Sequence, residues 1–233
     1  MPKSKILVFV VTYNSSFRLG LILKKLKTLR RKIKFDILIS DDCSTDNTKY
    51  YFPKNKSGYI LKINKRNLGY GGNVKKCLNF AIKKGYSHSL MVHGDNQYDC
   101  RYLEKFYKHM ILNNADAVTG SRMKNLNNAL IGKMPLYKIL GNLILTKIFN
   151  LIFKTNFTDA HSGFWLYNLS ALKKINLKKI DNNFNFDNQL RIKLIKAKKK
   201  ILEFPIKTYY RNEKSSLHVI YAIKFIIDML KFK

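Results

Sequence analysis

Residues 90–99 read LMVHGDNQYD, and this stretch guides the interpretation of the whole sequence. A short apolar run that gives way to glycine, then to carboxylates and amides, is typical of a buried strand that carries polar groups at its carboxyl end. Open α/β sheets bind their ligands at that end. Side chains two residues apart on an extended chain point the same way, so His93, Asp95 and Gln97 can face one cation. The oxygen ligands predict Mg²⁺ or Mn²⁺, and the imidazole favours Mn²⁺. An ordinary turn after a strand is the alternative.

Two apolar runs upstream, ILVFVV at 6–11 and FDILIS at 35–40, predict two further buried strands. Between them, leucine and isoleucine recur at three-and-four spacing over 19–33, which predicts an amphipathic helix with a basic outer face. A strand, a helix and a strand in this order indicate a right-handed βαβ unit. We therefore expect an α/β fold with a mostly parallel central sheet and helices on both faces.

The second strand ends in two consecutive carboxylates, Asp41 and Asp42. Acidic residues at this position can accept hydrogen bonds from a nucleotide base or ribose. Asp46 or Ser44, a little further along, is expected to cap the next helix. The glycine-rich loop NLGYGGN at 67–73 precedes a helix predicted over 73–84, and it indicates either a tight turn or a phosphate contact.

Four segments, taken in order, resemble family 2 glycosyltransferases of the GT-A fold: VTYN at 11–14, DDCSTD at 41–46, NLGYGGN at 67–73 and GDNQ at 94–97. Within the family, the likeness is to the dolichyl-phosphate-mannose synthase and polyprenyl-phosphate glycosyltransferase branch. The resemblance implies one GT-A domain over 1–216, with a donor half of about 1–123 and an acceptor half of about 124–216. A C-terminal amphipathic helix is expected over 217–233.

The resemblance also implies roles for residues of the donor half. Contacts to the donor nucleotide are expected from Val11, Tyr13, Ser15, Ser40, Asp42 and Gly94. A divalent metal, Mg²⁺ or Mn²⁺, is expected on Asp95 and Gln97. His93 stands where the family usually has the first aspartate of its Asp-x-Asp motif. It either coordinates the metal or hydrogen-bonds the ribose or a ligand water.

The resemblance places further groups near the donor phosphates and the acceptor. Arg122, in GSR at 120–122, can hold a phosphate through its planar fork. Asp159, in TDAHSGFW at 158–165, is the candidate catalytic carboxylate. It would remove a proton from a hydroxyl acceptor, whereas for a phosphate acceptor it would orient groups or help to hold the metal. Arg211 lies where the family supplies a basic residue to phosphate, although the usual pattern is altered here to RNEKSS. The family also carries an acidic residue near Asp187.

The composition indicates anionic partners. The chain has 45 Lys and Arg against 14 Asp and Glu, a formal charge of +31. Nucleic acid, an anionic membrane and phosphorylated small molecules all fit such an excess, to which compositional drift towards lysine contributes. The most apolar stretch, 135–153, is interrupted by lysine and asparagine, so we expect a helix at a membrane interface or in the core but not a membrane span. The polar stretch 124–128 before it is expected to be a loop over the site.

Cysteine usage and the N-terminus bear on location. Cys43, Cys77 and Cys100 are odd in number and lack metal-site spacing, which fits a reducing compartment. The apolar run at 6–11 is too short for a signal peptide. The expected location is the cytoplasm, at the cytoplasmic face of a membrane.

The sequence thus predicts a metal-dependent, inverting transfer of a sugar from a nucleotide diphosphate sugar to a polyprenyl phosphate. Transfer to a saccharide hydroxyl in surface polysaccharide synthesis is the alternative. A different class of hypothesis, suggested by the charge alone, is a non-catalytic basic protein that binds nucleic acid or anionic membrane. The ordered acidic motifs at the strand ends argue against it, so no nucleic-acid partner is expected. A donor-binding protein that has lost catalysis is a third hypothesis, suggested by His93.

Overall fold

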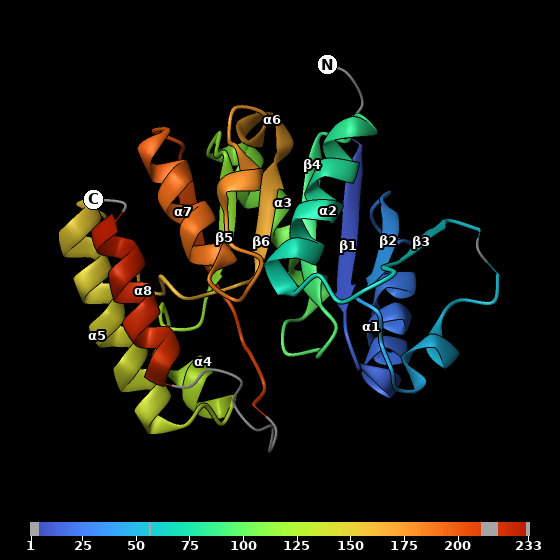
Figure 1. The fold of residues 1–233 in the computed structure, drawn as a ribbon, viewed down its shortest axis with the longest axis horizontal. Helices are drawn as coiled ribbons and strands as arrows, with labels where there is room; N and C mark the ends of the chain where they lie inside the picture. The colour runs from blue at the N-terminus through green and yellow to red at the C-terminus, as the bar shows by residue number, and fades with distance from the viewer. Residues whose placement is uncertain (1–4, 56, 211–218, 232–233) are drawn as a thin grey trace.

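The structure is a computed structural model that describes residues 5–55, 57–210 and 219–231. Its centre is a seven-stranded sheet in the order β3-β2-β1-β4-β6-β5-β7 (Figure 1). Neighbouring strands are parallel except for β6, which is antiparallel to both β4 and β5. The strands are β1 (Ile6–Thr12), β2 (Asp36–Asp41), β3 (Tyr59–Ile63), β4 (His88–His93), β5 (Ala117–Ser121), β6 (Trp165–Asn168) and β7 (Ile201–Pro205).

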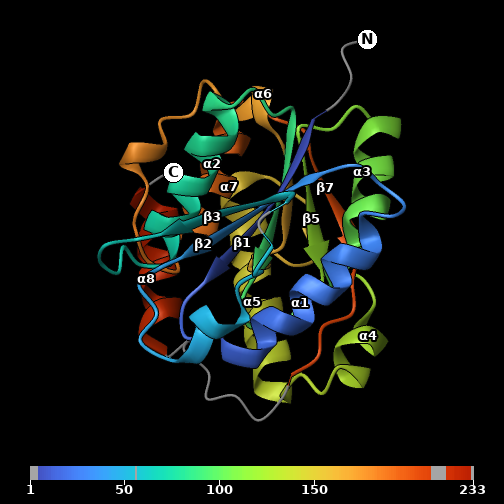
Figure 2. The same cartoon turned by 90° about the vertical axis from the view of Figure 1, so that its right-hand side faces the viewer.

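Helices cover both faces of this sheet, as predicted. Figure 2 shows α1 and α3 on one face and α2 and α7 on the other, and α5 and α8 lie side by side at one end of the molecule (Figure 1). The helices are α1 (Ser16–Leu29), α2 (Tyr70–Lys83), α3 (Leu103–Leu112), α4 (Leu126–Ile131), α5 (Leu136–Phe153), α6 (Leu169–Leu172), α7 (Phe186–Lys196) and α8 (Val219–Lys231), with 3₁₀ turns η1 (Asn47–Tyr51), η2 (Cys100–Tyr102) and η3 (Leu177–Lys179). The predicted α/β architecture is therefore confirmed.

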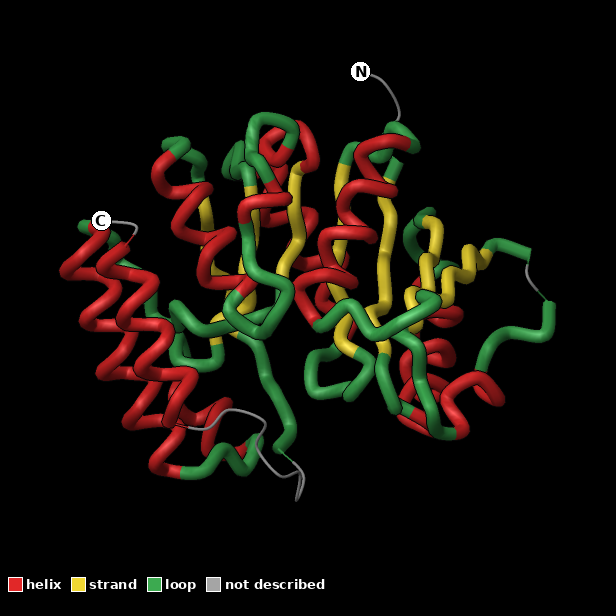
Figure 3. Tube along the Cα trace, in the orientation of Figure 1, coloured by secondary structure: helices red, strands yellow, loops and turns green. Residues whose placement is uncertain are grey.

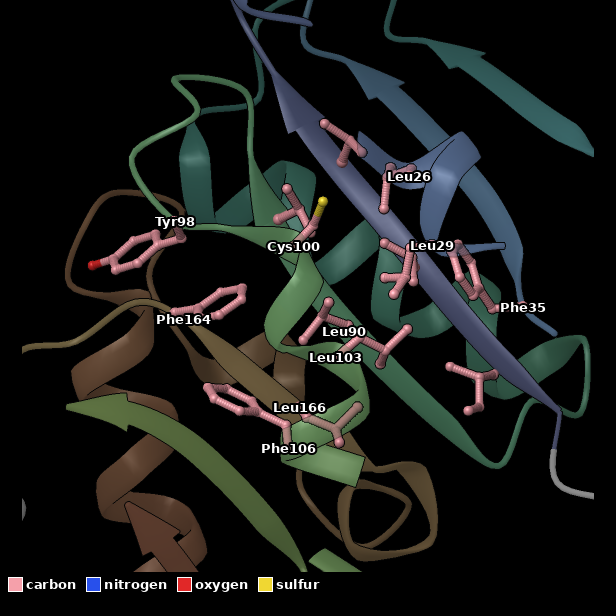
Figure 4. Close-up of a cluster of buried hydrophobic side chains, with 14 of the residues drawn as sticks. Leu26, Leu29, Phe35, Leu90, Tyr98, Cys100, Leu103, Phe106, Phe164 and Leu166 are labelled. Atoms are coloured by element: carbon pink, nitrogen blue, oxygen red, sulfur yellow. The ribbon is translucent and has the colours of Figure 1, made fainter. Parts of the chain in front are cut away.

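The core lies in two layers, one on each face of the sheet. Every residue of β1 is buried, and alternate side chains of a strand point to opposite faces. Val8 and Val10 accordingly join one cluster with α1 and α3, and Leu7 and Phe9 join a second cluster with α2 and α7. Figure 4 shows part of the first cluster, in which Phe164 packs beside the phenylalanine of α3. Each fully buried side chain of this kind contributes ~1.5–3 kcal/mol to folding.

Strand β6 was not predicted from the sequence. Its four residues are too few for a periodic pattern, and they directly follow a site motif. In the structure Leu166 pairs with Leu90 on β4, and Trp165 pairs with Thr119 on β5. Because β6 runs antiparallel, its first residue lies at the carboxyl ends of its neighbours. The turn over 159–164 is thereby brought to the predicted ligand edge.

Several boundaries differ from the predictions, and two of them have a clear physical reason. The loop expected over 124–128 is wrong in part, because α4 begins at Leu126 after Asn125 accepts a hydrogen bond from the backbone of Asn127. Helix α2 begins at Tyr70 instead of residue 73, so Gly71 and the next glycine lie in its first turn. Asp46 caps η1 by accepting a 2.9 Å bond from the backbone N–H of Thr48, which confirms its expected capping role.

Candidate active site

The residues predicted to bind the donor lie at the carboxyl ends of β1, β2 and β4. Val11 on β1 pairs with Ser40 on β2 and with His93 on β4. Since these strands are parallel, the loops that follow them leave the sheet at the same edge, below the strands in Figure 3. The predicted donor and metal groups therefore share one edge of the sheet.

Asp42 and Asp41 have different surroundings although they are adjacent. Asp42 is 3% exposed, and its Oδ1 accepts bonds from Asn64 Nδ2 at 2.7 Å and from the backbone N–H of Leu68 at 2.9 Å. Asp41 is fully buried and accepts bonds from the backbone N–H and hydroxyl of Ser44, which closes the turn after β2. The side chain of Asp42 is thus bound by the loop after β3, whereas that of Asp41 is bound by its own turn. Asn64 is a site residue that was not predicted from the sequence.

The other predicted nucleotide contacts differ in accessibility. Tyr13 is half exposed, whereas Ser15 is buried and donates its backbone N–H to Thr48 Oγ1 at 2.7 Å. Ser40 is fully buried, and its hydroxyl donates to Asn73 Oδ1 at 2.6 Å, which ties β2 to α2. A Cβ on Gly94 would lie 2.5 Å from the hydroxyl oxygen of Ser15, so no side chain fits there. Tyr13 is therefore the most accessible of these four residues.

His93 is held by the turn that precedes β6. Its Nε2 lies 2.8 Å from the carbonyl oxygen of Gly163 and 3.2 Å from the hydroxyl of Tyr70. A carbonyl only accepts, so Nε2 carries the proton and donates to Gly163. A protonated nitrogen cannot coordinate a metal, which leaves Nδ1 as the ring atom with that capacity.

Asp95 is the carboxylate that best fits a divalent metal at this edge. It is partly exposed, and its Oδ1 accepts a 2.9 Å bond from the backbone N–H of Gln97. Within residues 5–55, 57–210 and 219–231, no group of three or more His, Cys, Asp or Glu side chains is arranged to hold a metal. Mg²⁺ sites often use only one or two carboxylates and take their other ligands from substrate phosphates and water. A single carboxylate such as Asp95 fits that donor set, whereas Nε2 of His93 does not.

Arg122 and Asp159 form a buried ion pair at the end of β5. Arg122 donates from Nε to Oδ2 at 2.7 Å, from Nη2 to Oδ1 at 2.8 Å and from its backbone N–H to Oδ2 at 3.0 Å. Asn142 Nδ2 on α5 donates to Oδ1 at 2.8 Å, and Arg122 Nη1 donates to the hydroxyl of Tyr210 at 3.0 Å. Both members of the pair were predicted site residues, but their contact was not predicted.

This environment makes Asp159 a weak base. Burial alone would raise its pKa, but the charge of Arg122 and hydrogen bonds from Arg122 and Asn142 outweigh it and hold the pKa of Asp159 well below its usual range. The pKa of Arg122 is raised because Asp159 stabilises the guanidinium cation against the opposing effect of burial. Both groups are therefore charged at neutral pH.

Tyr98 joins the two parts of the site. Its ring contacts the His93 ring edge-on with centroids 5.2 Å apart, and it stacks on Phe164 at 5.1 Å. Burial raises the pKa of Tyr98 to about 12, and Arg122 and Asp159 are close enough to affect it. The ends of β4 and β5 are thus bridged by one buried aromatic side chain.

Asp187, at the start of α7, is a further carboxylate of the site that the sequence analysis did not assign. Its Oδ2 accepts a 2.7 Å bond from the hydroxyl of Tyr70, and its buried Oδ1 has no hydrogen-bond partner among the described residues. Burial raises its pKa to about 6, although His93, Tyr70 and Arg191 oppose the shift. A carboxylate poised near neutral pH can act as a general base. The only sequence signal for it was the acidic residue that the family carries nearby.

Arg211, the last predicted phosphate-binding residue, lies outside the described residues. The remaining predicted site residues are all described. They lie either at the carboxyl ends of β1, β2 and β4 or in the Arg122–Asp159 pair.

A family model described as glycosyl transferase family 2 matches residues 7–176. The chain belongs to glycosyl transferase family 2. This membership confirms the predicted family and the predicted enzyme class, and it argues against a non-catalytic basic protein.

Relatives of this glycosyltransferase carry more specific names. A UDP-N-acetylglucosamine–dolichyl-phosphate N-acetylglucosaminyltransferase of Methanococcus voltae is 28% identical over 216 residues, which cover 85% of each chain. A dolichyl-phosphate beta-glucosyltransferase of Trichomonas vaginalis is 26% identical over 249 aligned positions, which cover 99% of this chain and 73% of that protein. These relatives support the predicted likeness to the polyprenyl-phosphate branch.

Solved structures share the fold. The glucosyl-3-phosphoglycerate synthase of Mycobacterium tuberculosis, crystallised with Mn²⁺, UDP and phosphoglyceric acid, has a TM-score of 0.71 at 11% identity. The alignment covers 98% of this chain and 78% of that chain. The predicted GT-A fold is thereby confirmed.

Proposed function

We propose that this glycosyltransferase moves a sugar from a nucleotide diphosphate sugar to a polyprenyl phosphate, with inversion at the anomeric carbon and with Mg²⁺ or Mn²⁺ bound. It would work in the cytoplasm as a peripheral protein on an anionic membrane, in cell-envelope biogenesis. The donor half (about 1–123) would bind the nucleotide sugar, and the acceptor half (about 124–216) would bind the lipid phosphate.

The observation that carries this proposal is the distribution of side chains on α5, which buries polar groups and exposes apolar ones. Two of the three side chains that α5 buries are polar: Asn142, which donates to Asp159, and Thr146, whose hydroxyl donates to Asn142 Oδ1; the third is Phe149. Its exposed side chains are mostly apolar: Leu136, Tyr137, Leu140, Leu143, Ile144 and Leu151. A helix of a water-soluble protein normally has the opposite arrangement. One helix therefore has polar contacts with the buried ion pair and an apolar surface turned outward.

The apolar surface extends beyond α5. Exposed leucine and isoleucine side chains also occur on α4, at Leu126, Leu130 and Ile131, and on α8, at Ile223, Ile227 and Leu230. Helix α5 is also long and apolar enough to cross a membrane by length and composition. Its buried polar contacts favour a helix lying in the interface over a membrane span. Lys147 and Lys154 are exposed on or next to α5 and can attract anionic lipid, at about 1 kcal/mol each.

This arrangement suits an amphiphilic acceptor. The phosphate of a membrane lipid could reach Arg122 while its isoprenoid tail stayed in the bilayer that contacts α5. Only three of the five guanidinium N–H groups are used in the bonds to Asp159 and Tyr210, so Arg122 has the capacity to bind phosphate as well. Asp159 would serve by fixing the plane of the guanidinium.

The low basicity of Asp159 favours a phosphate acceptor over a hydroxyl. An ionised phosphate oxygen can attack the anomeric carbon without losing a proton, so no base is needed. The new bond joins that oxygen to the anomeric carbon. The bond between the anomeric carbon and the β-phosphate oxygen breaks, and its electron pair leaves with the nucleoside diphosphate. Attack from the face opposite the leaving nucleoside diphosphate inverts the configuration.

The other residues would hold the donor. Asp42, fixed by Asn64, would accept hydrogen bonds from the nucleotide, and Tyr13 would present an open ring beside it. Asp95 and Gln97 would hold the divalent metal. When bound, that metal would neutralise the charge of the departing diphosphate, which is worth several kcal/mol in the transition state.

The runner-up is transfer to a saccharide hydroxyl. Such an acceptor must lose a proton, and Asp187, with its pKa near 6, is better suited to take it than Asp159. The named relatives and the outward apolar face of α5 support the lipid acceptor more strongly.

The first experiment measures thermal stabilisation by UDP, GDP, CDP and dTDP, each with and without Mn²⁺. A ligand that binds only the folded state at a hundred times its Kd adds ~2.7 kcal/mol. Stabilisation by one nucleoside diphosphate that depends on Mn²⁺, and that is lost in Asp95→Asn, would identify the donor class. The absence of any shift would contradict nucleotide binding.

The second experiment offers the sugar nucleotide so identified to two acceptors, a short-chain polyprenyl phosphate in detergent and an oligosaccharide. Formation of a lipid-linked sugar from the first acceptor alone is the expected result. Transfer only to the oligosaccharide would favour the runner-up. Nucleotide binding without either product would indicate a donor-binding protein that has lost catalysis.

A further inference from the structure

Asp228 is a buried carboxylate on a largely apolar helix. It lies on α8, whose Phe225 and Met229 pack against Phe149 and Ile192 in a separate core cluster. Asp228 is 6% exposed, and its Oδ2 accepts hydrogen bonds from Gln189 Nε2 at 2.7 Å and from Asn185 Nδ2. A buried carboxylate is costly unless it is hydrogen-bonded, so these two amides account for its presence there.

Both amides belong to the start of α7, on either side of Asp187. Asn185 is the residue before α7, and its side chain makes no capping bond within that helix. Gln189 Oε1 also accepts a 2.9 Å bond from the backbone N–H of Asp181. Lys224 of α8 lies 3.4 Å from Asp181, but both side chains are about 40% exposed, so this ion pair contributes little. Among the residues whose side chains are described, Asp228 is therefore the main polar contact between α8 and the segment over 181–189.

The opposite side of this segment lies on the first turn of α2. The carbonyl oxygen of Asn182 accepts a 3.2 Å bond from the backbone N–H of Gly72. Phe184 stacks on Tyr70 with ring centroids 5.5 Å apart, and the Tyr70 hydroxyl donates to Asp187. The segment that carries Asp187 is thus held between α2 and α8.

We propose that Asp228 is a positioning residue for Asp187 and Tyr70, so that the C-terminal helix sets the geometry of the active site. This inference rests on the proposed function and deepens it. Among the described residues, Tyr70 alone donates a hydrogen bond to the Asp187 carboxylate, so the place of Asp187 depends on the first turn of α7. Without the Asp228 carboxylate, two amides at that turn would lose their acceptor and the turn could shift.

The chain contains its own reporter of such a shift. Trp165 is the only tryptophan in the sequence and is fully buried. The guanidinium of Arg191, on α7, lies 4.4 Å from the centre of its ring, and Tyr167 stacks on it at 5.4 Å. A cation and a ring at these distances affect tryptophan emission, so a displaced α7 should change the emission spectrum. This readout needs no transferase activity.

The test compares Asp228→Leu with Asp228→Asn in the whole chain over 1–233. Both amides donate to the same oxygen of Asp228, and an asparagine carbonyl oxygen has two lone pairs to accept both bonds. Asp228→Leu has no acceptor. Glu104→Gln is the matched control, since it makes the same carboxyl-to-amide change at an exposed ion pair on α3.

We expect Asp228→Leu to lower kcat about tenfold or more, because Tyr70 also contacts His93 at the end of β4, and a shift of an ångström in groups that orient the site can cost that much. The KM for the nucleotide sugar should stay within about twofold, because Asp42 and Asp95 lie on other elements. Emission from Trp165 should change in Asp228→Leu and match that of the wild type in Asp228→Asn and Glu104→Gln. Normal kcat and emission in a folded Asp228→Leu protein would overturn the proposal, as would equal impairment in Asp228→Asn.

If Asp228→Leu does not fold, Gln189→Met takes its place. It removes one of the two amide donors and should give a smaller change of kcat and emission in the same direction, and no change would overturn the proposal. A wild-type protein that transfers no sugar would refute the proposed function alone. The emission of Trp165 in the same variants would then still decide whether Asp228 positions α7.

Discussion

Arg122 binds both carboxylate oxygens of Asp159, through Nε at 2.7 Å and Nη2 at 2.8 Å. The Arg122 side chain is 11% exposed and that of Asp159 is fully buried. Such a two-point contact fixes the plane of the guanidinium as well as its position. Of the two roles expected for Asp159, proton acceptor or orienting group, the finding favours a group that orients Arg122.

Replacing Asp159 with alanine should therefore destabilise the fold strongly. The change leaves the Arg122 charge buried without its partner, which typically costs ~3–5 kcal/mol. The free energy of unfolding from urea titration measures the loss. Glu104→Ala, at the exposed pair with Lys108, is the control and should leave the midpoint essentially unchanged. A small effect of Asp159→Ala would mean that water reaches the pair.

Asp187 should make stability depend on pH in a defined direction. Its pKa is raised to about 6 in the folded protein, whereas an unfolded Asp titrates near 3.9. Between about pH 4 and pH 6 the folded state binds the proton that the unfolded chain has released, so the free energy of unfolding falls as the pH rises through this window. Above about pH 6 the loss of stability caused by ionising the buried Asp187 is complete.

Asp187→Asn removes that penalty and should be more stable than the wild type at pH 7.5. Two pKa units correspond to on the order of 3 kcal/mol, and the gain should nearly vanish at pH 4. Thermal melts of both proteins across this pH range measure the difference in stability. Groups that titrate alike in the two proteins contribute equally to both and cancel in this difference. A difference independent of pH would show that Asp187 does not titrate as described.

Gly71 should not tolerate a methyl group, although it lies in a helix. A Cβ there would lie 2.5 Å from the carbonyl oxygen of Asp181 and 2.8 Å from Cβ of Phe186. Gly71→Ala should lower the melting temperature because backbone must move. Gly141→Ala is the matched control within α5, where a Cβ meets nothing within 4 Å. The control should be more stable by up to about 1 kcal/mol, the usual gain in a helix interior.

The outward face of α5 should bind lipid through its leucines. Leu140→Gln combined with Leu151→Gln should weaken binding to anionic vesicles about tenfold or more, because each leucine contributes ~1.5–3 kcal/mol when it leaves water. Both side chains are exposed, so the melting temperature should hardly change. Leu112→Gln, on the exposed side of α3, is the control for vesicle sedimentation. Equal binding by all these proteins would contradict a membrane role for this face.

Much of the fold could be predicted because it depends on local patterns. The apolar runs at 6–11 and 35–40 became β1 and β2, and their polar ends met because parallel strands end at one edge. The missing strand, β6, has only four residues, and its place between β4 and β5 depends on pairings with residues far away in sequence.

The site was predicted in part for the same reason. Asp42 and Asp95 directly follow predicted strands, and polar groups at the carboxyl ends of parallel strands lie at the ligand-binding edge of the sheet. Asp187 stands at a helix start, and its raised pKa arises from burial, against the opposing effect of a hydrogen bond from Tyr70, which lies 117 residues away.

The sequence by itself determined the family, the order of the strands along the chain and the edge of the sheet at which the polar groups gather, since these follow from short motifs and from the period of apolar residues. Only the tertiary structure decided how the carboxylates differ. Asp159 is held ionised by Arg122 and Asp187 is shifted towards its neutral form, because the pKa of a carboxyl group depends on its burial and on the charges that folding brings beside it.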